Sequence, residues 1–154
     1  MLFAIVRNNW YTENYVPVVE TARRTGAIVA ATGQGRVASA TRADYAAGAA
    51  AVLVGEGHDG KVYEFTGDHA WDFNELATAI GEIIGRPVTF QPVDPATLIE
   101  ILTAAGVNEG TAGFMAALDN EISAGLLGDA STDLATVLGR PTTPLKEGLA
   151  AALD

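Results

Sequence analysis

Leu2-Phe3-Ala4-Ile5-Val6 is an unbroken apolar run near the start of the chain, directly followed by Arg7. A strand with no polar side chain on either face is typical of a parallel sheet that is covered on both sides. Parallel neighbours are joined by crossover connections of about a dozen residues or more. Because only Met1 precedes the run, we expect either an edge strand or a strand whose sheet partners this chain does not encode.

Short strand patterns alternate with amphipathic helix patterns along the rest of the chain. Helix starts are indicated by side chains that cap the first turn, among them the capping box Asp72–Glu75 and the pair Asp94-Pro95. We predict an α/β chain with a helix-rich second half. The predicted strands cover residues 2–6, 36–40, 61–66 and 88–91. The first predicted helix starts a few residues after Thr12, because Pro17 is tolerable only in a first turn, and the others start near Thr41, Asp72, Asp94, Thr111 and Thr143.

Composition excludes several classes of function. The 154 residues are 49% hydrophobic and 18% charged, which fits one folded domain and not a disordered chain. The net charge is −10, with Lys61 and Lys146 as the only lysines, so we expect no binding to nucleic acid or to an anionic membrane surface. No apolar run reaches the ~18 residues of a membrane span. The absence of cysteine excludes disulfides and fits a cytoplasmic protein.

Common catalytic and ligand motifs are missing. His58 and His69 lie in turn-rich segments without a second ligand at a suitable spacing, so we predict no metal site. The sequence Gly33-Gln34-Gly35 is followed by a strand pattern, whereas a dinucleotide loop opens a helix, and we therefore interpret it as a turn. There is no Gly-x-Ser-x-Gly elbow and no Tyr-x-x-x-Lys pair.

Residues 7–15 are the candidate site. A buried strand that is followed at once by Arg, two Asn, Trp and Tyr is costly unless those groups find partners. Ligands of open α/β sheets lie beyond the carboxyl ends of the strands. Asparagine can bind a carboxamide, and aromatic side chains can stack on a flat ring. The alternative interpretation is a loop whose aromatic side chains seal the core.

Four stretches, in this order, resemble one family: Ile5-Val6-Arg7-Asn8-Asn9-Trp10-Tyr11-Thr12-Glu13-Asn14-Tyr15, Ala38-Ser39-Ala40-Thr41-Arg42-Ala43-Asp44-Tyr45-Ala46, Gly60-Lys61-Val62-Tyr63-Glu64 with Gly67-Asp68 and Trp71, and Leu138-Gly139-Arg140-Pro141-Thr142-Thr143. They are similar to the NmrA-like, atypical short-chain dehydrogenases, and most of all to the type 2 NAD(P)H:quinone oxidoreductases. The resemblance implies the C-terminal part of an NAD(P)-binding Rossmann-like fold, without the glycine-rich N-terminal half. Residues 1–66 would be a remnant of the Rossmann sheet with its helices, and residues 67–154 a helix-rich, substrate-binding part of one lobe.

The same resemblance implies hydride transfer from NADPH or NADH to a quinone. Asn9 stands where the family pattern leads us to expect glycine, and asparagine tolerates a positive φ better than most residues do. The residues implied by position are Arg7, Asn8 and Asn9 for cofactor binding, Trp10, Tyr11 and Asn14 for substrate binding, and Asn8 and Tyr11 for catalysis.

Three functions stay open at this point. The chain is part of a quinone-reducing enzyme, or it resembles the NmrA-like redox sensors that bind a dinucleotide without turnover, or it is a truncated product with little activity of its own. Because no cradle for the pyrophosphate is identifiable, we expect weak NADPH binding by the isolated chain. We also expect self-association through the opening strand, or a loosened N-terminus.

Overall fold

The computed structural model describes residues 3–154 and divides into two compact units that the chain enters more than once. The first unit contains the chain up to Val16 together with Ala38–Ala70 and Asp129–Asp154. The second unit contains Pro17–Val37 and Trp71–Gly128.

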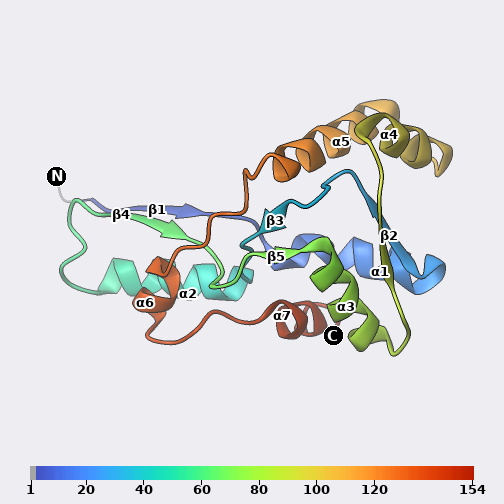
Figure 1. The fold of residues 1–154 in the computed structure, drawn as a ribbon. Helices are drawn as coiled ribbons and strands as arrows, with labels where there is room; N and C mark the ends of the chain where they lie inside the picture. Colours follow the sequence, from blue (N-terminus) through green and yellow to red (C-terminus); the bar gives the residue numbers. More distant parts are fainter. Residues whose placement is uncertain (1–2) are drawn as a thin grey trace. The chain divides into compact units, whose positions relative to one another are not determined.

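The first unit is built on a two-stranded parallel sheet, β1 with β4, in which Ile5 lies opposite Val62 and Asn8 opposite Phe65. Helix α2 runs along this pair, and α6 contacts both α2 and β4 (Figure 1). The elements of this unit are β1 (Ile5–Asn8), η1 (Thr12–Tyr15), α2 (Arg42–Val54), β4 (Val62–Phe65), α6 (Asp133–Leu138) and α7 (Leu145–Ala151).

The core of the first unit lies between the sheet and these helices. Its buried members are Ala40, Tyr45, Phe65 and Leu134. Gly48 permits the close approach of α2, because a Cβ at this position would lie 2.5 Å from Leu134 Cδ1 and 2.8 Å from Phe65 Cε2. Small residues on one face of α2 thus let the helix pack tightly against the sheet.

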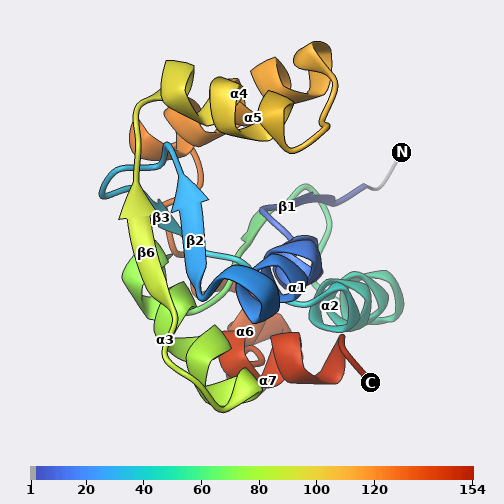
Figure 2. The ribbon, with the colours of Figure 1, turned by 90° about the vertical axis from the view of Figure 1, so that its right-hand side faces the viewer.

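The second unit has two separate strand pairs. Strands β2 and β6 run parallel, side by side (Figure 2), and β3 pairs with β5 in the antiparallel direction. Helices α4 and α5 pack against each other. The elements are α1 (Val16–Thr25), which starts at the last residue of the first unit, β2 (Ala27–Ala30), β3 (Arg36–Val37), β5 (Trp71–Asp72), α3 (Phe73–Ile84), β6 (Thr89–Pro92), α4 (Pro95–Ala104) and α5 (Glu109–Ser123).

The α/β class and the helix starts are confirmed. The Asp72 side chain accepts from the backbone of Asn74 and Glu75, and the Glu75 side chain closes the capping box. Asp94 caps α4, whose first residue is Pro95. Among residues 3–154, no helix has the length and apolar character that crossing a membrane requires.

The strand boundaries needed correction. The strand predicted over residues 2–6 is observed as Ile5–Asn8, because its register is set by β4; Leu2 lies outside the described residues. Side chains of the run are also not covered on both faces, since Phe3 is 53% and Ile5 44% exposed. The strand predicted over residues 36–40 is regular only at Arg36–Val37, and β2 was not predicted.

The segment after Thr12 confirms that the first α-helix starts a few residues later, as Pro17 led us to expect. It begins as a 3-10 turn, Thr12–Tyr15, and becomes α-helical only at Val16. Pro17 then falls in the first α-helical turn, where its missing N–H breaks no hydrogen bond.

Candidate functional site

The predicted site residues all lie in the first unit, at the carboxyl end of β1. Arg7 and Asn8 are the last two residues of the strand, and the chain then continues through Asn9, Trp10 and Tyr11 into η1. This is the end of a parallel strand at which ligands of α/β sheets bind. The candidate site therefore starts where the β1–β4 pairing stops.

Backbone hydrogen bonds fix the turn after β1. The Asn9 N–H donates to the Phe65 carbonyl at 2.9 Å, and the Ala40 N–H donates to the Trp10 carbonyl at 3.2 Å. The Thr12 N–H in turn donates to the Ala40 carbonyl at 3.0 Å, so Tyr11 forms an isolated parallel bridge with Ala40. The backbone at Ala40, just before α2, thus pairs with residues 10–12 as a strand would and fixes the turn.

Two residues of α2 hold the aromatic part of the site. The Tyr45 ring meets the Tyr11 ring edge-on, with centroids 5.4 Å apart and planes at 73°. The Tyr45 hydroxyl donates to the Trp10 carbonyl at 3.1 Å. Burial raises the pKa of this hydroxyl above its usual value, so it remains a neutral donor. The Arg42 guanidinium lies over the Tyr11 ring, 5.6 Å from its centroid, and covers one face of it.

The 3-10 turn is anchored to the start of α2. The Thr12 and Ser39 hydroxyls lie 2.9 Å apart and share a hydrogen bond. The Glu13 carboxylate accepts from the Arg42 N–H through both oxygens, at 2.9 and 3.2 Å, and so occupies the helix N-terminus. The Asn14 N–H donates to the Tyr11 carbonyl at 3.1 Å. The Asn14 side chain, three residues after Tyr11, is half-buried.

The polar residues predicted to bind the cofactor differ in their surroundings. Arg7 forms an ion pair with Glu64, its neighbour across the sheet, so its charge is balanced locally. Asn8 is exposed, and the Asn9 side chain donates to the Ala38 carbonyl at 3.4 Å. The positive φ considered for Asn9 is not used, because only glycines have positive φ among the described residues.

A buried carboxylate ties the C-terminal motif to α2. Asp44 accepts from the Arg140 guanidinium and from the Thr143 N–H, each at 2.7 Å. Burial by itself would raise the Asp44 pKa, but these hydrogen bonds outweigh it and hold the pKa below the usual value. Asp68 and Thr142 add a reciprocal pair of hydrogen bonds at 2.8 and 3.0 Å.

Sequence reasoning missed the roles of Tyr45, Arg42 and Asp44. The available signal was the spacing of Arg42 and Tyr45, which places them on one face of a predicted helix. Their partners lie about thirty residues or more away in the sequence, so the contacts themselves had no local signature.

A cradle for phosphate groups is not found in residues 3–154. Gly33-Gln34-Gly35 connects β2 to β3, as the turn interpretation predicted, and no helix begins there. No group of three or more His, Asp or Glu side chains in the described part of the chain could hold a metal ion. His58 Nδ1 instead lies 2.6 Å from the Tyr63 hydroxyl.

Comparison with known proteins gives close matches along nearly the whole chain. No family model matches. Quinone oxidoreductase 2 of Escherichia coli is 41% identical over 149 residues, which are 97% of this chain and 52% of that protein. The crystal structure of the E. coli NADPH-dependent quinone oxidoreductase complexed with NADPH superposes with a TM-score of 0.90 at 40% identity and covers 100% of this chain and 54% of its own.

A second solved structure, triphenylmethane reductase of Citrobacter sp. complexed with NADP(H), superposes with a TM-score of 0.87 at 39% identity. It covers 95% of this chain and 51% of its own. The chain thus spans about half the length of the curated relatives it matches.

Proposed function

This chain belongs to the NmrA-like family of atypical short-chain dehydrogenases, and from that premise we propose that it forms the nicotinamide- and acceptor-binding side of an NAD(P)H-dependent quinone reductase. The observation that carries the proposal is the fixed turn of amide and aromatic side chains beyond the carboxyl end of β1. The E. coli relative supports the choice of chemistry, since it is an NADPH-dependent quinone oxidoreductase.

The residues present fit one end of a dinucleotide. Asn8 offers an exposed amide, which can pair with a carboxamide, and the half-buried aromatic residues Trp10 and Tyr11 follow it in the chain. The pyrophosphate requires a strand, a glycine-rich turn and a helix N-terminus. Among the residues described, the only comparable glycine turn leads into β3. The described residues therefore offer no site of this kind for the pyrophosphate.

We assign the roles as follows. Asn8, with Arg7 and Asn9 next to it, orients the nicotinamide end of the cofactor, which supplies the hydride when it is bound. Trp10 and Tyr11 position the acceptor ring. The Tyr11 hydroxyl and the Asn8 amide donate hydrogen bonds to the oxygen on which negative charge develops.

The Asn14 side chain belongs to the acceptor side in this assignment. It follows Tyr11 by one turn of the 3-10 segment, and its backbone is fixed by the bond to the Tyr11 carbonyl. We expect it to contribute to acceptor binding and not to the chemical step.

A chimera tests the function. This chain replaces the matched segment of E. coli quinone oxidoreductase 2 in a single polypeptide, and NADPH oxidation with a small quinone is followed at the nicotinamide absorbance band. We expect turnover that falls by about tenfold or more in Asn8→Ala and in Tyr11→Ala. Asn120→Ala, at an exposed position of α5, is the matched control and should leave turnover unchanged.

Two other results would change the conclusion. A chimera that binds NADPH with full affinity but does not oxidise it supports the redox-sensor alternative. A folded chimera that neither binds NADPH nor turns over overturns the proposal.

A further inference from the structure

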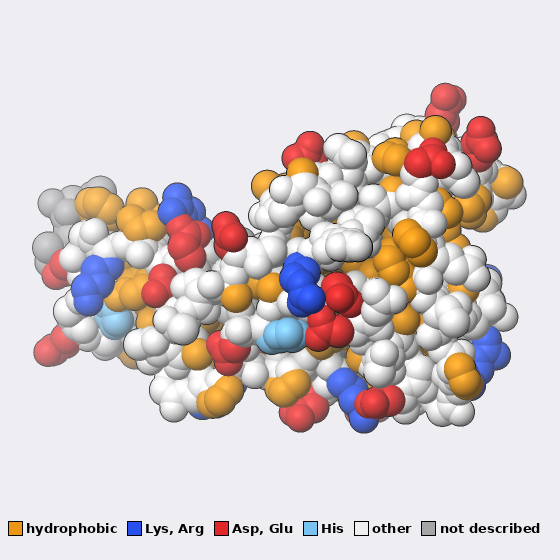
Figure 3. Space-filling model, viewed as in Figure 1, with side chains coloured by type: hydrophobic (Ala, Val, Ile, Leu, Met, Phe, Trp, Pro, Cys, Tyr) orange, Lys and Arg blue, Asp and Glu red, His pale blue; other side chains and the backbone are white. Residues whose placement is uncertain are grey.

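Ion pairs balance the charge of several exposed basic side chains. Arg7 pairs with Glu64 in the first unit. Arg36 pairs with Asp72 and with Glu75 in the second unit. Figure 3 shows basic and acidic side chains beside each other at several places on one face. A cation that already has a carboxylate partner attracts an anionic ligand weakly, because the ligand has to displace that partner.

Arg42 is an exposed cation of a different kind. Its guanidinium lies over the Tyr11 ring, 5.6 Å from the ring centroid, and it forms no ion pair among residues 3–154. A guanidinium is planar, and when it lies over an aromatic ring the N–H donors at its edge remain available to a carboxylate or a similar planar anion. The candidate site therefore carries a positive charge that the described residues do not balance by pairing.

The first turn of α2 holds Arg42 in place without using its guanidinium. Glu13 accepts from the Arg42 backbone N–H through both carboxylate oxygens, at 2.9 and 3.2 Å. The Thr41 hydroxyl accepts from the Asp44 N–H at 3.1 Å and caps the helix that begins at Arg42. Because the backbone is fixed, an ion pair with a ligand costs less conformational entropy than it would on a loose loop.

The cation and the aromatic part of the site are positioned by the same helix. Tyr45, one turn after Arg42 on α2, meets the Tyr11 ring edge-on with centroids 5.4 Å apart. The position of the guanidinium relative to the Tyr11 ring is thus set by two contacts from one element. A ligand ring beside Tyr11 brings a substituent within reach of the guanidinium without any movement of α2.

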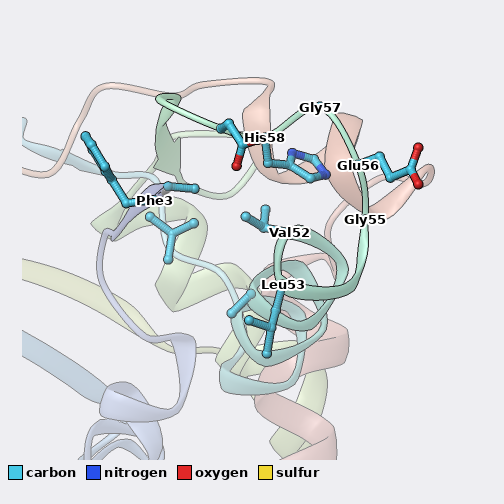
Figure 4. A pocket seen from close by; sticks show the side chains of 11 residues that line it. Phe3, Val52, Leu53, Gly55, Glu56, Gly57 and His58 are labelled. Carbon is cyan, nitrogen blue, oxygen red and sulfur yellow. The ribbon is translucent and has the colours of Figure 1, made fainter. Parts of the chain in front are cut away.

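The hollow at the amino end of β1 carries charge of the opposite sign. It has a volume of about 500 Å³, and its walls include the last turns of α2 and the loop at residues 55–59. Figure 4 shows Phe3 on one side of it and His58 on the loop. The Asp and Glu residues in the lining, Glu56 and Asp59, have no Lys or Arg beside them there. An anionic ligand is repelled at this hollow and attracted at Arg42.

We propose that Arg42 determines which acceptor the candidate site takes, and that the acceptor is a quinone with an acidic ring substituent whose anionic group pairs with the guanidinium. The quinone ring lies against Trp10 and Tyr11, as assigned above. In naming the substrate class of that site, the inference rests on the proposed function.

The acidic substituent takes no part in the bond changes. The quinone gains a hydride, with its electron pair, from the reduced nicotinamide, which is left oxidised. A proton from water then completes the hydroquinone. The substituent keeps its negative charge throughout, so its pairing with Arg42 is equally strong before and during hydride transfer. The pairing should therefore act on KM more than on kcat.

A pair of acceptors tests this specificity in the chimera with E. coli quinone oxidoreductase 2. The probes are naphthoquinone and a naphthoquinone sulfonate, and kcat/KM for the sulfonate is divided by kcat/KM for the neutral quinone. Arg42→Met keeps an apolar stem and the backbone bond to Glu13, and we expect it to lower this ratio about fivefold, mainly through KM. Lys61→Met removes an exposed cation next to β4 in the same unit, and as the matched control it should leave the ratio unchanged.

Binding of a redox-inert anion to this full chain tests the same contact without cofactor or turnover. Naphthalene sulfonate and the neutral naphthalene methanol are titrated separately while the NMR signals of the Tyr11 ring are followed. We expect the sulfonate to bind about fivefold more tightly, and this preference to disappear in Arg42→Met. Arg42→Lys should retain part of it, since lysine keeps the charge and loses the planar donor group.

Each contrary result has its own meaning. An unchanged acceptor ratio in Arg42→Met, or sulfonate binding that this variant does not weaken, would overturn the proposal while turnover of the neutral quinone kept the proposed function intact. Equal losses with both quinones would make Arg42 a support for Tyr11 only and would overturn it too. A folded chimera that reduces neither quinone, together with sulfonate binding that depends on Arg42, would count against the proposed function and support the anion site.

Discussion

Tyr45 contacts the candidate site in two ways, through the hydrogen bond from its hydroxyl to the Trp10 carbonyl and through the edge of its ring against Tyr11. The side chain is 2% exposed, so both contacts are made out of water. The Trp10 carbonyl also accepts from the Ala40 N–H, so removal of the Tyr45 hydroxyl would take away one of its two hydrogen bonds. Tyr45 is therefore a positioning residue: it holds the backbone of the turn and the orientation of the Tyr11 ring.

Replacing Tyr45 by Phe separates the two contacts. The ring packing stays and the hydrogen bond is lost, so we expect a loss of about 1 kcal/mol in the free energy of unfolding, measured with urea. In a Trp71→Phe background, the fluorescence of Trp10 should also shift. Tyr63→Phe loses a hydroxyl that contacts His58 and should leave the Trp10 signal unchanged; a similar shift in both variants would contradict this role.

Asp119 is a residue whose charge opposes folding. It lies half-buried on α5 and accepts a hydrogen bond from the Ala31 N–H at 2.8 Å. Burial raises the Asp119 pKa, the hydrogen bond lowers it, and the effect of burial is larger, so the pKa lies above the usual value. The folded state then keeps a proton that the unfolded state has already released. Stability therefore falls as the pH rises from the usual aspartate pKa through the raised one.

We accordingly expect Asp119→Asn to be more stable than the natural chain at neutral pH and to lose this advantage in acid. Thermal unfolding across pH 3 to 8, on the order of the range in which carboxyl groups titrate, measures the difference. The same change at the exposed Asp129 is the control. An Asp119→Asn variant that is less stable at every pH would show that the carboxylate is needed for packing.

At the scale of elements, helix starts were predictable and strands were not. The capping residues Asp72 and Asp94 act within three residues of themselves, so their effect is written in the local sequence. A strand is defined by its partner. The two-residue β3 exists because Trp71 lies opposite Val37, thirty-four residues later in the chain, and β2 exists because of β6.

The candidate site shows the same division. The order of residues 5–15 predicted that polar and aromatic residues follow the carboxyl end of β1. The sequence did not predict the contacts of Tyr45 and Arg42 with Tyr11, because the periodicity of one segment does not report a contact with another segment. The open question about Asn9 was likewise settled only by its backbone, which has no positive φ.

Two glycine substitutions test close packing between elements of the second unit. At Gly35, a Cβ would lie 2.3 Å from the Ile122 carbonyl oxygen, a backbone atom that cannot move away alone. At Gly113 in α5, nothing lies within 4 Å. We expect Gly35→Ala to destabilise by roughly 1–3 kcal/mol and Gly113→Ala to stabilise by about 0.5–1 kcal/mol. Urea unfolding measures both changes. A shift of the free energy of unfolding in the same direction in both variants would contradict this account.

At the scale of the molecule, each unit is assembled from distant parts of the chain. In the first unit, Asp44 joins α2 to the C-terminal motif through Arg140 and Thr143. The Asp44 side chain is 1% exposed while that of Arg140 is 51% exposed, so the ion pair is partly screened and the backbone bond is not.

We expect Asp44→Ala to cost about 2–3 kcal/mol in stability, because it removes charged hydrogen bonds from two donors. The depressed pKa gives the pH dependence its sign: the stabilisation is present above the usual aspartate pKa and is lost as the pH falls through the lower folded value. The natural chain should thus lose more stability than the variant on acidification. Parallel acid titrations, followed by circular dichroism, would refute this if the two curves had the same shape.

The isolated chain should bind a dinucleotide only through its nicotinamide end. Dinucleotide affinity depends strongly on a pyrophosphate held at a helix N-terminus, and residues 3–154 contain no glycine turn that opens a helix after a strand. The isolated chain should therefore bind NADPH no more tightly than nicotinamide mononucleotide, since the described residues have no binding site for the additional adenosine and phosphate groups. In the chimera, the same comparison should favour NADPH by about a hundredfold or more. Titration calorimetry of both ligands against both proteins measures this, and micromolar binding of NADPH by the isolated chain would mean that its own residues hold the phosphates.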